Sequence, residues 1–265
     1  CIIFFFLSFV VMIEPFECKY ALVSKELRFF QARFFQKYNL EEYRFDDVEA
    51  TAVIMFGFYS KEDYHTIMKL IHSGKTVYMV WGGMDCHTKC HFKKIPARLD
   101  IIHVAISLTI QRVLKENNID CIFWKSFSLL DETLFQPQKS LQVNPTHVYI
   151  YNGLFGKSYR ELFFRKDIYD KVMKDLIEKY KFTKEQFILS NSLHESYESM
   201  PEIYSKCFIG LRLCDKDGNA NTVQEFESLK IPIIHNCSRY GIKWSSTEDI
   251  IEIILANRQN VSKSR

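Results

Sequence analysis

The sequence predicts an α/β protein made of two Rossmann-like units, each a doubly wound parallel sheet. Short apolar stretches alternate with amphipathic helical patterns through most of the chain. Continuous apolar strands separated by helices are typical of parallel sheets covered on both faces. The alternation stops at residues 136–145, a polar segment with two prolines, and then restarts. We therefore expect two domains, residues 1–140 and residues 145–265, joined by a short linker.

The first domain shows this alternation from about Thr51 onward. Its strands are expected at residues 52–57, 76–81, 101–106 and 121–124. After the first strand, apolar residues recur with the spacing i, i+3, i+4 and i+7, namely Tyr64, Ile67, Met68 and Ile71. This spacing indicates an amphipathic helix. A second helix is expected after the third strand, running through Lys115.

The second domain repeats the pattern. Its strands are expected at residues 147–151, 187–189, 208–213 and 231–234. The first helix carries an apolar stripe made of Ile168, Val172, Leu176 and Tyr180, and further helices are expected at 200–206, 222–230 and 247–256. Sheets of this kind bind ligands beyond the carboxyl ends of their strands, so functional residues are expected in the loops that follow strands.

Composition excludes some classes of protein. A net charge of +3, with basic and acidic residues interspersed, argues against a nucleic-acid-binding protein. Several of the eight cysteines lie in apolar, strand-like stretches, which favours free thiols in a reducing compartment and a cytoplasmic location. Residues 1–13 carry no charge, but a membrane-spanning helix needs ~20 residues. Membrane association through this segment is the alternative, and the initial Cys1 is compatible with a fragment.

The most informative stretch is residues 208–236, in which a strand enters a loop with Asp217, Gly218 and Asn219. A helix follows near Thr222, so the loop and Asn221 supply free backbone N–H groups at a helix start, where anions bind. Carboxylates at such a place suit ligands with hydroxyl groups, because hydroxyls donate hydrogen bonds to them.

Each of these residues also has a purely structural interpretation. Thr222 and Glu225 have the spacing of a capping box, in which the glutamate only completes the start of the helix. Asp217 followed by Gly218 is also an ordinary turn signal.

The same stretch resembles the retaining glycosyltransferases of family four, which have the GT-B fold. That family places an acidic residue, seven others and a glutamate in a strand–loop–helix–Pro–strand setting, and Asp217, Glu225 and Pro232 fill these positions. A second match is the D-x-x-x-F-x-P ending of the first domain, made of Asp131, Phe135 and Pro137. The sequence departs from the family by having Asp in place of the first Glu, a short first domain and no recognisable glycine-rich acceptor loop.

The resemblance implies a nucleotide-diphosphate sugar as donor, linked to UDP or GDP, with no cofactor and no metal. Asp217 is then expected to contact the donor sugar, and Glu225 the nucleotide ribose. In the family, a basic pair after the first strand of the second domain neutralises the diphosphate. Lys157 and Arg160 are the candidates for this pair, with Arg165 and Arg212 as alternatives and a solvated basic loop as the structural explanation.

The first domain offers a candidate acceptor side. Gly82, Gly83 and Asp85 follow a strand, where they either shape the acceptor site or form a tight turn. The nearby cysteines and histidines could ligate zinc, but no second cysteine pair at finger spacing supports this and no metal is expected; they are Cys86, His87, Cys90 and His91. His103, inside an apolar strand, is expected to be a core residue.

The sequence thus predicts a metal-independent hexosyltransferase that transfers a sugar with retention to a glycan, lipid or protein acceptor. A nucleotide-sugar epimerase of the same fold is one rival. A non-catalytic protein that binds nucleotide sugars or glycans is another, and the short first domain favours it.

Overall fold

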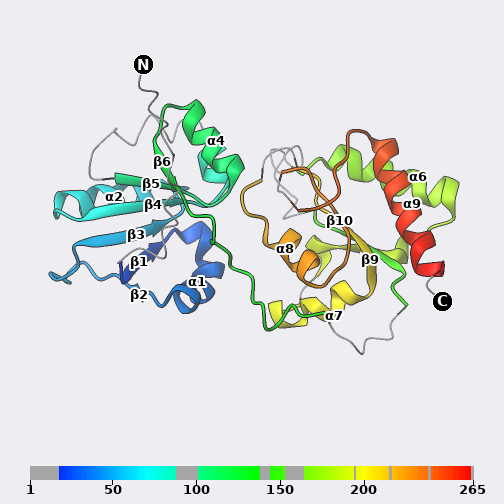
Figure 1. Cartoon of the computed structure of the whole chain (residues 1–265), viewed down its shortest axis with the longest axis horizontal. Coiled ribbons are helices and arrows are strands. Elements are labelled where there is room, and N and C mark those ends of the chain that lie inside the picture. The colour runs from blue at the N-terminus through cyan, green and yellow to red at the C-terminus, as the bar shows by residue number, and fades with distance from the viewer. Residues whose placement is uncertain are drawn as a thin grey trace, which may run out of the picture. The chain divides into compact units, whose positions relative to one another are not determined.

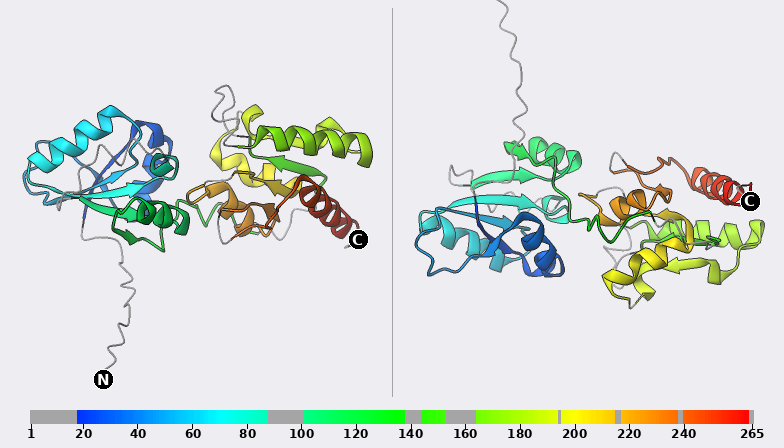
Figure 2. Two further views of the ribbon diagram at one scale, coloured as in Figure 1. Left: turned by 90° about the horizontal axis from the view of Figure 1, so that it is seen from above. Right: turned by 60° about the horizontal axis from the view of Figure 1, so that its bottom comes forward.

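The computed structural model describes residues 18–87, 101–137, 144–152, 164–193, 195–214, 217–237 and 240–263. The chain divides into two compact units, Cys1–Leu129 and Leu130–Arg265 (Figure 1). Each unit holds one sheet in which every pair of neighbouring strands is parallel. Helices flank both sheets in the views of Figure 2.

The first sheet has six strands in the order β2-β1-β3-β4-β5-β6. Their bounds are β1 Tyr20–Val23, β2 Glu41–Glu42, β3 Ala52–Phe56, β4 Thr76–Trp81, β5 Ile101–Ala105 and β6 Cys121–Phe123. The order reverses between β1 and β3, because the chain first adds β2 on one side and then builds β3 to β6 on the other. The four strands expected from the sequence are confirmed to within one or two residues.

The helices of the first unit are η1 Lys25–Phe30, α1 Gln31–Tyr38, α2 Lys61–His72, η2 Met84–His87 and α4 Leu108–Glu116. The sequence pattern predicts no element between residues 14 and 50, yet β1, η1, α1 and β2 all lie there. They belong to the core because α1 presents Phe34, whose ring centre lies 4.8 Å from that of Phe56 and 6.2 Å from that of Phe127. Burial of such rings stabilises a short helix that would be marginal in isolation.

The second sheet has four strands in the order β10-β9-β7-β8. Their bounds are β7 His147–Ile150, β8 Phe187–Leu189, β9 Cys207–Leu211 and β10 Ile233–Ile234. The helices are α6 Lys166–Tyr180, η3 Lys184–Gln186, η4 Ser190–Ser192, η5 Tyr197–Ser199, α7 Met200–Ser205, α8 Asn221–Ser228 and α9 Thr247–Lys263. All four expected strands and all four expected helices are present, and α9 is longer than expected.

Side-chain alternation along β7 separates two apolar cores in the second unit. Val148 and Ile150 pack in one core with residues of α6 and α9, which lie side by side in Figure 1. Tyr149, between them in sequence, packs in the other core with residues of α7 and α8 and with Phe135. Successive residues of a strand point to opposite faces, so these two cores define three layers, helix–sheet–helix.

Two general expectations can be compared with the structure. The cysteines that the structure describes are free thiols: Cys18, Cys86, Cys121, Cys207, Cys214 and Cys237. Within the described ranges, no helix combines the length and the apolar character that crossing a bilayer requires.

Candidate functional site

The candidate site lies at the carboxyl ends of β7 and β9. Strand order reverses there, since the chain leaves β7 to form β8 on one side and returns to form β9 and β10 on the other. Open parallel sheets bind ligands at such a reversal, because the loops leaving the two strands diverge and leave a crevice. The residues at these strand ends are Tyr151 and Asn152 after β7, and Arg212 to Cys214 after β9.

Tyr169 of α6 holds the two diverging strand ends together. Its hydroxyl donates to the carbonyl oxygen of Tyr151 at 2.9 Å and accepts from the backbone N–H of Leu213 at 2.7 Å. Burial raises the pKa of this hydroxyl well above its usual value, so it remains protonated and remains a donor. The sequence pattern does not predict this role, because Tyr169 lies next to the apolar stripe of α6 and carries no motif of its own.

Asn152 joins the end of β7 to the segment after β8. Its side-chain amide donates to Asn191 at 2.7 Å, and its carbonyl oxygen accepts from the hydroxyl of Ser190 and the backbone of Asn191, each at 2.9 Å. The residue is buried. It therefore links the end of β7 to the segment after β8.

Arg212 and Asp217 form a buried ion pair at the centre of the site. Arg212 Nε donates to one carboxylate oxygen at 2.5 Å and a terminal nitrogen to the other at 3.3 Å, with both side chains about one-tenth exposed. The guanidinium carbon also lies 3.9 Å from the ring centre of Tyr151. The backbone N–H of Gly218 donates to the same carboxylate at 2.9 Å. Despite the burial, the guanidinium lowers the pKa of Asp217, so the carboxylate is charged.

Helix α8 begins directly beside this pair. Its N-cap is Ala220, which makes no side-chain cap hydrogen bond, and the helix starts at Asn221, one residue before the expected start. The first N–H groups of a helix have no partner within it, so they and the helix dipole form an anion-binding end. Gly218, Asn219, Asn221 and Thr222 are thus grouped at this end, as the sequence predicted, and Arg212 reaches the Thr222 hydroxyl at 3.4 Å.

Close packing of α8 on the sheet depends on Gly210 in β9. A Cβ atom on this residue would lie 2.5 Å from Cε1 of Phe226, which is closer than any real Cβ contact. The missing side chain therefore allows α8 to lie low over β9, with its first turn at the carboxyl end of that strand.

Glu225 is not part of a capping box. Because the N-cap is Ala220, the glutamate is the fifth helical residue, where its side chain cannot reach back to the N-cap. Its Oε2 instead accepts a hydrogen bond of 2.9 Å from the hydroxyl of Tyr204, and the carboxyl group is buried. Burial and then the charge of Glu225 raise the pKa of Tyr204 well above its usual value. The capping interpretation is therefore wrong.

The expected basic pair, Lys157 and Arg160, lies outside the described residues. Of the two alternatives, Arg165 starts α6 with a left-handed backbone, φ 51°, and its Nε lies 3.4 Å from the carboxylate of Asp167. Arg212 lies in the site itself, as described above. Within the described residues, Arg212 is the cation that belongs to the strand ends where a diphosphate is expected.

In the first unit, Asp85 holds a tight turn together. One of its oxygens accepts from the backbone N–H groups of Phe58 and Gly82 at 3.0 and 2.9 Å. The other accepts from Gly83 and Cys86 at 2.8 and 3.0 Å. Burial outweighs these bonds and raises the pKa of Asp85 to about 6. A carboxylate that is 1% exposed and satisfied by four backbone groups favours the tight-turn interpretation of Gly82, Gly83 and Asp85.

The residues considered as zinc ligands in the first unit are only partly described. Cys86 is buried and its thiol donates to the carbonyl oxygen of Gly83 at 2.8 Å, whereas Cys90 and His91 lie outside the described residues. His103 accepts a hydrogen bond from the indole of Trp81 at 3.2 Å, and burial lowers its pKa to about 4. This is the environment of a neutral histidine within the sheet, although His103 is half-buried and not a fully buried core residue.

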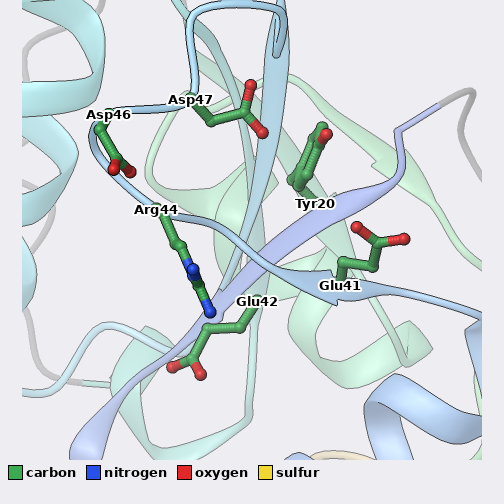
Figure 3. Close-up of a pocket in the computed structure, with 6 residues that line it drawn as sticks. All are labelled: Tyr20, Glu41, Glu42, Arg44, Asp46 and Asp47. Atoms are coloured by element: carbon green, nitrogen blue, oxygen red, sulfur yellow. The ribbon is translucent and has the colours of Figure 1, made fainter.

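A polar pocket of about 570 Å³ lies beside the first residue of β1. Its lining is drawn in Figure 3 and consists of Tyr20, Glu41, Glu42, Arg44, Asp46 and Asp47. The Asp47 carboxylate faces the Tyr20 ring in Figure 3, and their hydrogen bond lowers the pKa of Asp47 and raises that of Tyr20. The pocket is at the amino end of β1, whereas sheets of this class bind ligands at the carboxyl ends.

Comparison with known proteins bears on the fold. No protein-family model matches the sequence, and a comparison with curated proteins found no match. Among solved structures, the chain is similar to a sucrose-phosphate synthase from Thermosynechococcus elongatus, with a TM-score of 0.54 and 10% identity, over 90% of this chain and 73% of that one. It is also similar to HepE from Anabaena, solved in complex with UDP, with a TM-score of 0.52 and 9% identity, over 82% and 75% of the two chains. The similarity confirms the expected fold class: two Rossmann-like α/β units with parallel sheets, as in the GT-B fold.

Proposed function

We propose that the second unit binds a nucleotide-diphosphate sugar, linked to UDP or GDP, and that the chain transfers the sugar to an acceptor. The observation that carries this proposal is the start of α8, which lies at the strand reversal with Arg212 and Glu225 beside it. Within one strand–loop–helix segment, an anion-binding helix end and a guanidinium match the diphosphate of such a donor, and a buried carboxylate matches its ribose hydroxyls.

The names of the structural neighbours support the same class of ligand. One is a sucrose-phosphate synthase and the other was solved with UDP bound. The residues at the site of this chain have the chemistry to bind a nucleoside diphosphate, so the proposal does not depend on the fold alone.

In the proposed mechanism, cations and N–H groups stabilise the diphosphate as the bond to the sugar breaks. The N–H groups at the start of α8 supply about half a positive charge. Arg212 lies beside them but is paired with Asp217, so we assign most of the remaining positive charge to Lys157 and Arg160. Electrostatic stabilisation of the leaving group means that no side chain need be a strong nucleophile, and the configuration is retained if the acceptor attacks from the face that the diphosphate leaves.

We further propose that no metal ion bridges the diphosphate. Glu225 accepts hydrogen bonds from the ribose hydroxyls, while Tyr204 fixes the orientation of its carboxylate. Asp217 remains the predicted contact of the donor sugar, and it also holds Arg212 in place. Addition of Mg²⁺ or Mn²⁺ should therefore leave turnover unchanged.

The test combines calorimetric binding of UDP and GDP with a donor-turnover assay on a panel of UDP- and GDP-linked sugars. Glu225→Gln should weaken nucleotide binding about 10- to 150-fold, which corresponds to a hydrogen bond of about 1.5–3 kcal/mol to a charged group. Tyr204→Phe is the matched control for stability, because it removes the hydrogen bond to Glu225 and leaves the carboxylate. Absence of binding by every nucleotide and nucleotide sugar would refute the proposal.

A non-catalytic nucleotide-sugar or glycan-binding protein is the second candidate. The observation in its favour is that Arg212 and Gly218 already occupy both carboxylate oxygens of Asp217, which leaves the expected sugar contact few lone pairs. Binding of a nucleotide sugar without turnover selects this candidate. Release of free nucleotide without an acceptor selects an epimerase instead.

A further inference from the structure

Three potential metal ligands converge behind the loop that leads into α8. They are the thiol of Cys214, the carboxylate of Asp217 and a ring nitrogen of His235, whose ligand atoms all lie within 4.8 Å of one another. The thiol and the carboxylate are already in contact, with Sγ of Cys214 3.1 Å from an oxygen of Asp217. Cys214 and His235 are each 0% exposed. Sequence analysis assigned no function to either residue.

The hydrogen bonding of His235 is an independent observation that points to a metal ion. Its Nδ1 lies 2.9 Å from the carbonyl oxygen of Arg212, and a carbonyl can only accept, so Nδ1 carries the proton. Nε2 is then a lone-pair donor, and no hydrogen-bond partner for it is found among the described residues, although the residue is completely buried. A histidine whose other nitrogen is tied to a backbone carbonyl has the tautomer that metal sites use.

Sheet topology explains why these residues meet. Cys214 follows β9 and His235 follows β10, and these strands are parallel neighbours with Leu211 paired to Ile234. Their carboxyl ends therefore lie together, although 21 positions separate the two residues in sequence. Cys237 comes two residues after His235, and its thiol donates to the carbonyl oxygen of Cys214 at 3.0 Å. This contact places a second thiol next to the group of three.

We propose that Cys214, Asp217, His235 and Cys237 bind a divalent metal ion, with zinc the best match to two thiolates, an imidazole and a carboxylate. Charge supports this set of ligands. Two thiolates and one carboxylate carry three negative charges, while zinc and the buried guanidinium of Arg212 together carry three positive ones. The site is then neutral overall, and Arg212 orients the carboxylate from outside the metal's ligand shell.

For Cys214, Asp217 and His235 the distances require only a small contraction, whereas Cys237 is placed by its contact with the Cys214 carbonyl oxygen and must move further. The centre of a triangle with 4.8 Å sides lies about 2.8 Å from its corners, whereas zinc binds these atoms at about 2.0–2.3 Å. Cys214 and Asp217 are closer than that limit already. Cys237 is half-buried, unlike the completely buried Cys214.

The ion ties the loop before α8 to the segment after β10 and thereby fixes the start of that helix. This role is structural and differs from a metal on the donor diphosphate. The inference does not depend on the proposed function, although a zinc-bound Asp217 leaves the donor sugar to other groups.

The experiment measures the metal directly in the full chain, purified in reducing buffer. We expect one zinc ion per chain by elemental analysis, and exchange for Co²⁺ should give the thiolate-to-cobalt charge-transfer absorption and the intense visible bands of a tetrahedral site. Cys237→Ser should lower the charge-transfer absorption to about half, because one of two thiolates is lost. Removal of the metal by a strong chelator should lower the Tm.

Cys121→Ser is the matched control, since Cys121 is also a half-buried free thiol but lies in the first unit. It should leave metal content and the cobalt spectrum unchanged. Equal spectra for wild type and Cys237→Ser, or a chain that holds no zinc and gives no cobalt spectrum in reducing buffer, would overturn the proposal. A metal-free protein with a Cys214–Cys237 disulfide in its mass spectrum would overturn it as well.

Discussion

The buried pair of Arg212 and Asp217 gives a prediction about stability that needs no ligand. Arg212→Met removes the cation and leaves a carboxylate that is about one-tenth exposed without its partner. Breaking a buried pair from one side costs about 3–5 kcal/mol, because the remaining charge is held away from water. Asp217→Asn should cost a similar amount, and the double variant clearly less than the sum of the two.

A surface pair on α6 is the control. Lys166 and Asp170 are also 2.5 Å apart, but their side chains are 40% and 62% exposed. Exposed pairs at this spacing contribute about 0.3–0.5 kcal/mol, so Lys166→Met should have a small effect. The two pairs have the same shortest distance, so a difference between Arg212→Met and Lys166→Met measures burial together with the other contacts of Arg212, namely those with the Tyr151 ring and Thr222.

Urea unfolding followed by tryptophan fluorescence is the assay. Trp244 is the one tryptophan of the second unit, so its signal reports on the unit that holds the pair. The pKa of Asp217 is lowered in the folded chain from its ordinary 3.8, so the stability it contributes is present above that pH and is lost as pH falls through the folded value. The reasoning is refuted if Arg212→Met costs no more than Lys166→Met, or if the two single effects at the pair simply add.

Three further predictions concern other parts of the chain. Gly210→Ala should destabilise the second unit by about 1–3 kcal/mol in urea unfolding, since its Cβ would lie 2.5 Å from Phe226. Adding Phe226→Leu should restore part of this stability. If it restores none, the strain does not come from Phe226. Lys157→Ala with Arg160→Ala should weaken binding of UDP or GDP far more than binding of the nucleoside, measured by calorimetry at low salt, whereas equal losses would place the diphosphate elsewhere. Because the pKa of Asp85 is raised to about 6, the stability of the first unit should fall as pH rises from about 4 to 6. The NMR signals of the backbone amides that donate to Asp85 should shift with a midpoint near pH 6. Amide signals that do not change between pH 5 and 7 would contradict the raised pKa.

Much of the fold could be predicted because parallel α/β sheets leave strong local patterns. Strands such as Thr76–Trp81 are continuous apolar stretches, and helices such as Lys166–Tyr180 carry their apolar residues at helical spacing. Burial on both faces of a strand and on one face of a helix produces these patterns directly. The sequence pattern did not predict the segment from β1 to β2, because its elements are short. Its helix α1 buries aromatic residues, and these residue types have no strong preference for helix.

The loop-to-helix segment at residues 217–225 was also found from sequence, since the order loop, helix start and glutamate is local. The sequence did not predict which hydrogen-bond partner each side chain takes. The capping-box pattern of Thr222 and Glu225 fits the sequence, but the helix starts too early for it, and Tyr204 of another helix takes the carboxylate. Likewise, the sequence predicts that Asp217 contacts a ligand, whereas in the structure its carboxylate forms an ion pair with Arg212.

The sequence by itself therefore determined the class of the fold, the positions of most elements and the segment in which the candidate site lies. Only the tertiary structure decided which residues of that site meet. Tyr169 joins β7 to β9, and Cys214 comes to His235, because the order of the strands brings their carboxyl ends side by side. Strand order depends on how helices pack over the whole sheet, and no local spacing of residues records it.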